Sequence, residues 1–197
     1  MSRRAATVVL ALALWPSPAA AHLVTTGLGP VYDGLVHFAM TPEDLIPTLA
    51  LALLAGLRGA SHGRRTLFVL PAAWLVGGVV GLTVPHGLSA TPTSISFVLI
   101  GGLVAADARL PLAVTTALAV SLGVVHGYLN GSALAQPAFG GSAVLGIVAA
   151  VFTLVALAAS AVVPLRAAWA RIVVRVAGSW IAAIGLLLFG WSFRPSG

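Results

Sequence analysis

Residues 142–163 read SAVLGIVAAVFTLVALAASAVV, without a charged side chain, and the run ends at Pro164. An α-helix rises about 1.5 Å per residue, so this run is long enough to cross roughly 30 Å of hydrocarbon. The whole chain has the same character: 59% of its residues are hydrophobic, 7% are charged, and the mean hydropathy is +1.08. A soluble domain of 197 residues needs more polar surface than this to cover itself. The composition therefore predicts a protein whose outer surface faces lipid.

Five further apolar runs, joined by short loops, accompany residues 142–163. The first opens with TPED at residues 41–44, in which Thr suits the cap, Pro the first helical position and the acids the first turn. The loops are too short to hold a soluble domain. We therefore predict an all-α fold: one polytopic transmembrane helical bundle with six spans, formed by residues 22–197. The other five runs are residues 41–57, 66–84, 91–106, 111–129 and 176–193.

The N-terminal run has a different character, and we predict that it is removed. Residues 1–21 begin with two arginines, continue through a short apolar segment at residues 8–15 and end in alanines at residues 19–21. A basic start, a short apolar middle and a small-residue end are typical of a secretory signal peptide. Cleavage after Ala21 would make His22 the mature N-terminus. The alternative is an uncleaved anchor, which is disfavoured because two prolines interrupt the segment.

The distribution of charge predicts the membrane topology. The chain has no lysine, its arginines fall in alternate loops, and the intervening loops at residues 85–90 and 130–141 have none. Because positively charged loops stay in the cytoplasm, we predict an inner-membrane protein with both termini outside. The net charge of +6 is then a topology signal, and no nucleic-acid partner is expected, since no soluble basic domain carries the charge. The arginines predicted to be cytoplasmic are Arg58, Arg64, Arg65, Arg109, Arg166, Arg171 and Arg175.

The sequence gives little support to an enzyme. It contains no cysteine, which excludes disulfides, thiolate-bound zinc and thiol catalysis. It also lacks the His-Glu-x-x-His, Gly-x-Ser-x-Gly and Cys-x-x-Cys-His motifs of zinc proteases, serine hydrolases and c-type haem proteins. We therefore expect a protein without catalytic activity and without a prosthetic group. The rival reading is an intramembrane enzyme or haem protein that would use isolated histidines.

Ionisable residues gather at the outer end of the predicted bundle. Asp33 and His37 are four residues apart, so a helix there would turn both to one side. Glu43 and Asp44 follow at the start of the first span, and His126 lies near the outer end of the fourth. Imidazole nitrogens and carboxylate oxygens together suit nickel, cobalt, zinc, copper(II) or iron(II). We predict that these five residues form a metal site, which requires the first and fourth spans to be neighbours, with His126 in reach of Glu43 or Asp44.

Structural roles are the alternative for each of these residues. Glu43 and Asp44 would then complement the helix dipole at the start of a span. Asp33 and His37 would form a local hydrogen bond or a pH-sensitive pair. His126 would make a hydrogen bond inside the bundle, because an imidazole near the end of a span needs a polar partner.

Two polar motifs of this chain resemble those of the HupE/UreJ family of small membrane proteins. The family's first motif is a His followed, after five residues, by Asp-His; here His37 is followed after five residues by Glu43 and Asp44. Its second motif is His-Gly with a Glu a few residues later; His126 and Gly127 match it, and the Glu is missing. A signal peptide ending in Ala-His and six apolar runs extend the similarity over most of the mature chain, which looks like the family's shorter, divergent branch.

The resemblance implies a permease for nickel or cobalt, associated with the maturation of hydrogenase or urease. His37, Glu43 and Asp44 would capture the ion at the outer face and pass it to His126, while Asp33 would orient His37. The ion is the substrate, the partners are the divalent ion and membrane lipid, and a homo-oligomer is left open. The alternative is a non-transporting membrane assembly or scaffold protein linked to metalloenzyme maturation, in which the polar cluster is structural.

Overall fold

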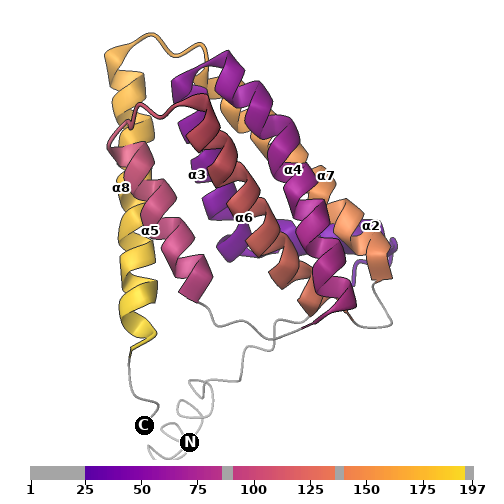
Figure 1. Cartoon of the computed structure of the whole chain (residues 1–197). Coiled ribbons are helices and arrows are strands. Elements are labelled where there is room, and N and C mark those ends of the chain that lie inside the picture. The colour runs from indigo at the N-terminus through magenta and orange to yellow at the C-terminus, as the bar shows by residue number, and fades with distance from the viewer. Residues whose placement is uncertain (1–24, 86–90, 136–139, 194–197) are drawn as a thin grey trace, which may run out of the picture.

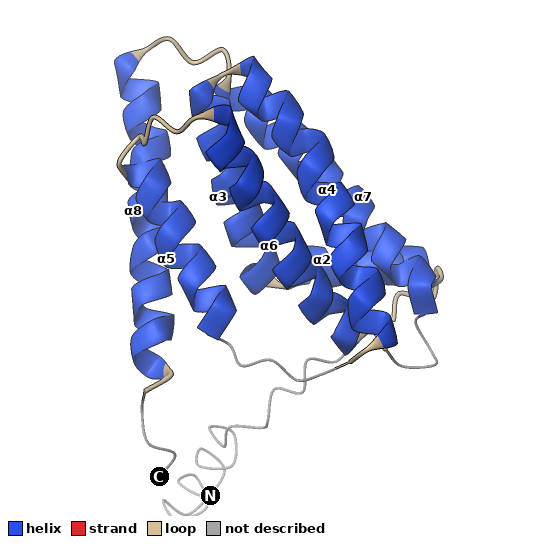
Figure 2. Cartoon of the chain, viewed as in Figure 1, coloured by secondary structure: helices blue, strands red, loops and turns tan. Residues whose placement is uncertain are grey.

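The computed structural model describes residues 25–85, 91–135 and 140–193, and every regular element in these ranges is a helix (Figure 2). The predicted all-α fold is therefore confirmed for the described part of the chain. The predicted signal peptide, residues 1–21, lies outside it. The seven helices are α2 (Pro30–Met40), α3 (Pro42–Arg58), α4 (Ala60–Thr83), α5 (Thr91–Ala105), α6 (Leu112–Ala133), α7 (Gly140–Val162) and α8 (Ala168–Trp191).

Not all of these helices are long enough to cross a membrane alone. By length and hydropathy, α4, α6, α7 and α8 qualify. The pair α2 and α3 passes the same test together but is bent by 76° between the two helices, as in a broken span or a re-entrant loop. The helix α5 has 15 residues and is too short. The described residues thus support four spans, or five with the bent pair, and six spans stay a prediction.

The bend between α2 and α3 has a local cause. Thr41 is extended, with φ −105° and ψ 92°, and Pro42 occupies the first position of α3. A residue that precedes proline avoids the α region, and proline cannot donate the backbone hydrogen bond that would continue α2. The helix direction therefore changes at this point, and α2 lies crosswise to the bundle, packed against α7 (Figure 1).

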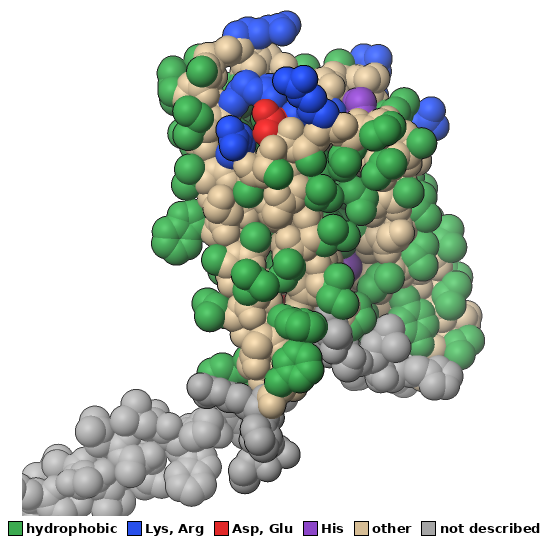
Figure 3. Space-filling model, turned by 60° about the vertical axis from the view of Figure 1, so that its left-hand side comes forward, with side chains coloured by type: hydrophobic (Ala, Val, Ile, Leu, Met, Phe, Trp, Pro, Cys, Tyr) green, Lys and Arg blue, Asp and Glu red, His purple; other side chains and the backbone are tan. Residues whose placement is uncertain are grey.

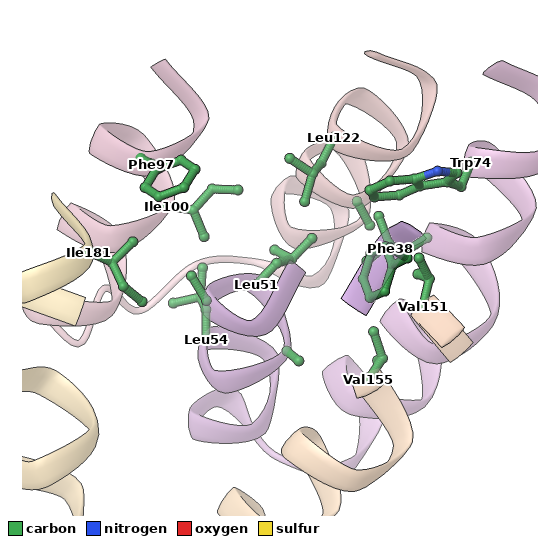
Figure 4. Packing of buried hydrophobic residues seen from close by; sticks show 14 of the residues in the cluster. Phe38, Leu51, Leu54, Trp74, Phe97, Ile100, Leu122, Val151, Val155 and Ile181 are labelled. Atoms are coloured by element: carbon green, nitrogen blue, oxygen red, sulfur yellow. The ribbon is translucent and has the colours of Figure 1, made fainter. Parts of the chain in front are cut away.

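The central helix is α3, which contacts each of the other six described helices. Its Leu51 and Leu54 are fully buried. Figure 4 shows them between an apolar group from α5 and α8, which includes Phe97, and a second group from α2, α4 and α7, which includes Trp74.

The arginines of the described ranges gather at one end of the bundle (Figure 3), where α3, α5 and α7 end and α4, α6 and α8 begin. The prediction that the arginines lie in loops was only partly right. Arg64 and Arg65 lie on α4, and Arg171 and Arg175 lie on α8. These helices begin before their apolar stretches do, because long arginine side chains can reach water from a helix whose backbone already enters the lipid. Hydropathy alone misses such polar first turns.

Candidate metal site

The polar centre of the bundle is a carboxylate–imidazole pair. Asp44, in the first turn of α3, and His126, in the last two turns of α6, are 4% and 1% exposed. His126 Nδ1 lies 2.8 Å from Asp44 Oδ1. The other carboxylate oxygen, Asp44 Oδ2, accepts a hydrogen bond of 2.8 Å from Asn130 Nδ2, and the same amide donates to the His126 carbonyl oxygen at 2.9 Å. Both oxygens of a buried carboxylate therefore have partners, as their burial requires.

The far side of the His126 ring meets α5. Its Nε2 lies 3.1 Å from Ser96 Oγ, and that hydroxyl also donates to the Thr93 carbonyl oxygen at 2.7 Å. The imidazole thus has a polar partner at each nitrogen. A cavity of about 300 Å³ between α5 and α6 borders His126 and Ser96 and is otherwise lined mainly by apolar side chains.

Aromatic packing fixes the plane of the imidazole. The indole ring of Trp74, on α4, lies 5.7 Å from the His126 ring, centroid to centroid, at an angle of 39°. Phe38, on α2, meets the same indole edge-on at 5.8 Å. Both aromatic side chains are almost completely buried. This packing allows His126 little freedom to rotate away from Asp44.

The five predicted site residues do not all meet. Asp44 and His126 are in direct contact. His37, half-buried on α2, interacts electrostatically with Asp44. Glu43 is exposed. Asp33 Oδ1 instead accepts two hydrogen bonds of 2.6 Å from Thr26, one from the backbone and one from the hydroxyl. Within the described ranges, no three His, Cys, Asp or Glu side chains converge in a way that could hold a metal ion by themselves.

Two neutral side chains with buried oxygens lie on the same helices as the pair. Asn130 Oδ1 is buried without a hydrogen-bond partner among the described residues, and so is Thr48 Oγ1, which lies one turn beyond Asp44 on α3. Asn130 and Ser96 were not predicted as site residues. The spacing of Asn130 four residues after His126 puts both on one face of α6 and could have revealed it. Nothing in the sequence links Ser96 to His126, because the contact joins different helices.

The arrangement is compatible with a divalent cation. Two ligand atoms that occupy adjacent positions around one ion, each about 2.1 Å from it, are separated by about 3 Å. The 2.8 Å between His126 Nδ1 and Asp44 Oδ1 is close to that separation. Alternatively, Asp44 can hold the ring by Nδ1–H and leave Nε2 to the ion, since carboxylates commonly orient metal-binding imidazoles in this way.

Comparison with known proteins identifies one family. Residues 10–188 match the family model described as HupE / UreJ protein, which is most of the chain. No match is found among curated proteins. None is found among solved structures.

Proposed function

This chain belongs to the HupE/UreJ family, and from that membership and the buried Asp44–His126 pair we propose that it is an inner-membrane permease for a divalent transition metal, nickel or cobalt. The family is associated with nickel or cobalt transport, or with urease or hydrogenase maturation. Its members are membrane proteins of a transporter type and are not known as enzymes. In this proposal both termini face outward, and the ion enters from the end of the bundle opposite the arginines.

The observation that carries the proposal is the burial of the ionisable Asp44 against His126 inside a mainly apolar bundle. A carboxylate at membrane depth is expensive, and such groups usually mark an ion or substrate pathway. Two apolar side chains would pack here at a lower free-energy cost than this buried pair. The cost of burying the pair is explained if the pair binds a cation.

The proposed route begins outside the pair. Glu43, exposed at the start of α3, and His37, half-buried on α2, would attract and partly desolvate the ion before it reaches Asp44 and His126. Asp33 would act from α2 as a further outer charge. Beyond the pair, Thr48 offers one more buried oxygen, and then Leu51 and Leu54 close the interior. Passage therefore requires the helices around α3 to separate, and a divalent cation moving inward gains about 4–5 kcal/mol per 100 mV.

The small number of charged ligands suits transport. Conduction requires a site that binds strongly enough for entry and weakly enough for release. One imidazole and one carboxylate, completed by neutral oxygens or water, form a weaker site than the fully ligated centres of resident structural metals.

A specific observation favours the rival scaffold function. Both nitrogens of His126 and both oxygens of Asp44 already have hydrogen-bond partners in the protein. Such a satisfied network would fix the packing of α3, α5 and α6 without any metal. The two functions differ in whether the purified protein binds a divalent ion.

The proposal can be tested by isothermal titration calorimetry, in which nickel is added to the purified protein. We expect saturable binding that Asp44→Asn, which nearly preserves shape, weakens by about tenfold to hundredfold. His62→Ala is the matched control, because His62 lies at the arginine end beside Arg58 and Arg109, and it should bind as the unchanged protein does. Equal affinity in all three folded proteins, or no binding in any, would favour the scaffold.

A further inference from the structure

A second polar cluster lies at the arginine end of the bundle. Asp107, in the turn after α5, accepts hydrogen bonds from Nη2 of Arg58, the last residue of α3, and from Nη2 of Arg171, on α8. The contacts to Arg171 measure 2.9 Å and 3.1 Å. One carboxylate therefore faces two guanidinium groups from two different helices.

These groups border an open pocket of about 510 Å³ that carries excess positive charge. Its charged lining consists of Arg58, Arg109, Arg171 and the single carboxylate of Asp107. Arg109 is exposed and forms no ion pair with any residue of the described ranges. Three arginines and one carboxylate thus line the same pocket, and we refer to this feature as the arginine pocket.

One nitrogen of the Arg58 side chain lacks a hydrogen-bond acceptor among the described residues. The Arg58 side chain is only 9% exposed, and its Nε is buried without a hydrogen-bond acceptor in the part of the chain that the structure describes. A buried donor of a charged group that lacks an acceptor is costly. Asp107 itself has φ 49°, an uncommon conformation for a residue other than glycine, and such strain concentrates at binding sites.

We propose that the arginine pocket binds a phosphate-class anion: the phosphoryl group of an anionic phospholipid, or free phosphate. A planar guanidinium offers paired donors that match phosphate oxygens, and three of them would more than neutralise one phosphodiester. The location fits a lipid headgroup, because the exposed Trp169 lies two residues before Arg171 on α8 and tryptophans favour the membrane interface. Basic pockets between helix ends on the cytoplasmic side are suited to anionic headgroups.

Native mass spectrometry of the full-length protein in detergent can test this site. Phosphatidylglycerol should bind more tightly than phosphatidylcholine, and Arg109→Gln should weaken phosphatidylglycerol binding about fivefold. Arg65→Gln is the matched control, since Arg65 is also exposed at the same end but lies outside the arginine pocket. Arg109 has no ion pair in the described ranges, so its loss should not impair folding.

A second variant separates ligand binding from a structural role. Asp107→Asn removes the carboxylate that competes for Arg58 and Arg171, and asparagine tolerates the left-handed backbone at this position. Phosphatidylglycerol should then bind more tightly, whereas a purely structural ion pair predicts no gain.

Added inorganic phosphate distinguishes the source of the anion. Competition by phosphate indicates a site that accepts any phosphoryl group, and phosphatidylglycerol binding that phosphate does not displace indicates a lipid site. Equal phosphatidylglycerol binding by Arg109→Gln and Arg65→Gln, or no tightening in Asp107→Asn, would overturn the proposal.

Discussion

Asp44 is the side chain around which the candidate site is organised. Its expected closeness to His126 is present as a 2.8 Å contact, although a role for either residue in metal binding stays a prediction. The sequence could not choose between Glu43 and Asp44. Consecutive helical residues point about 100° apart, so only one of the two acids can face the interior of the bundle. In the structure, Asp44 lies on the buried face of α3 with Thr48 and Leu51, and Glu43 is exposed.

At the same scale, Asn130 should be essential to the stability of the site. Asn130→Leu removes the donor to Asp44 Oδ2 and leaves a buried carboxylate oxygen without a partner. We expect a loss of about 1–3 kcal/mol, measured as a lower midpoint of thermal unfolding in detergent. Ser179→Ala, on the exposed face of α8, is the control and should change little. An unchanged midpoint for Asn130→Leu would show that the carboxylate has another donor.

At the scale of elements, glycines hold α4 and α6 together. Gly77 and Gly81, four residues apart on α4, both meet the backbone of α6. In return, Gly127 of α6 faces the Trp74 carbonyl of α4. Two glycines four residues apart show that another helix can approach closely. They do not indicate which helix does so, since every neighbouring helix in lipid is equally apolar.

A methyl group at Gly127 should disturb both the helix pair and the site. Gly127→Ala would place Cβ against the Trp74 carbonyl, so α6 must move away from α4 and carry the adjacent His126 with it. We expect a destabilisation of about 1–3 kcal/mol in detergent and weaker nickel binding. Gly102→Ala is the matched control, because a Cβ there meets no atom within 4 Å. If both variants unfold at the same temperature, the close contact of α4 with α6 is not as described.

The helix α2 was predicted only conditionally, and its direction was not predicted at all. The spacing of Asp33 and His37 is meaningful only on a helix, and residues Pro30–Met40 do form one. Its crosswise direction depends on a tertiary contact: Gly34 lies directly against the backbone of Ala143 on α7. Local sequence explains why the chain turns at Thr41 and Pro42, but the position of α2 follows from a surface on α7 that no local pattern reveals.

At the scale of the whole molecule, helical content and the gathering of arginines at one end could be predicted from the sequence, but the number of spans could not. The apolar run at residues 91–106 forms the short helix α5. The run at residues 41–57 forms α3, which is one half of the bent pair with α2. The exposed Trp169 and Trp191 lie near the two ends of α8. A separation of 22 residues corresponds to about 33 Å of helix, which is close to the thickness of the hydrocarbon layer.

The proposed orientation can be tested by cysteine labelling, because the natural chain has no cysteine of its own. Ser61→Cys lies at the arginine end and Ser192→Cys just after α8, and both positions are exposed. A membrane-impermeant maleimide added to spheroplasts should label Ser192→Cys at once and Ser61→Cys only after lysis. The reverse pattern would place the arginine end outside and remove the basis for an outward-facing Asp44 and His126.

The most direct test of the permease is nickel influx into proteoliposomes that contain a nickel-sensitive dye, with the interior held negative by a potassium gradient. We predict influx well above that of protein-free vesicles for the unchanged protein and for His62→Ala. Replacing both members of the pair, in Asp44→Asn/His126→Ala, should abolish it in protein that is folded and equally incorporated. Influx into the double variant equal to that of the unchanged protein, or no influx in any of them, would contradict the account.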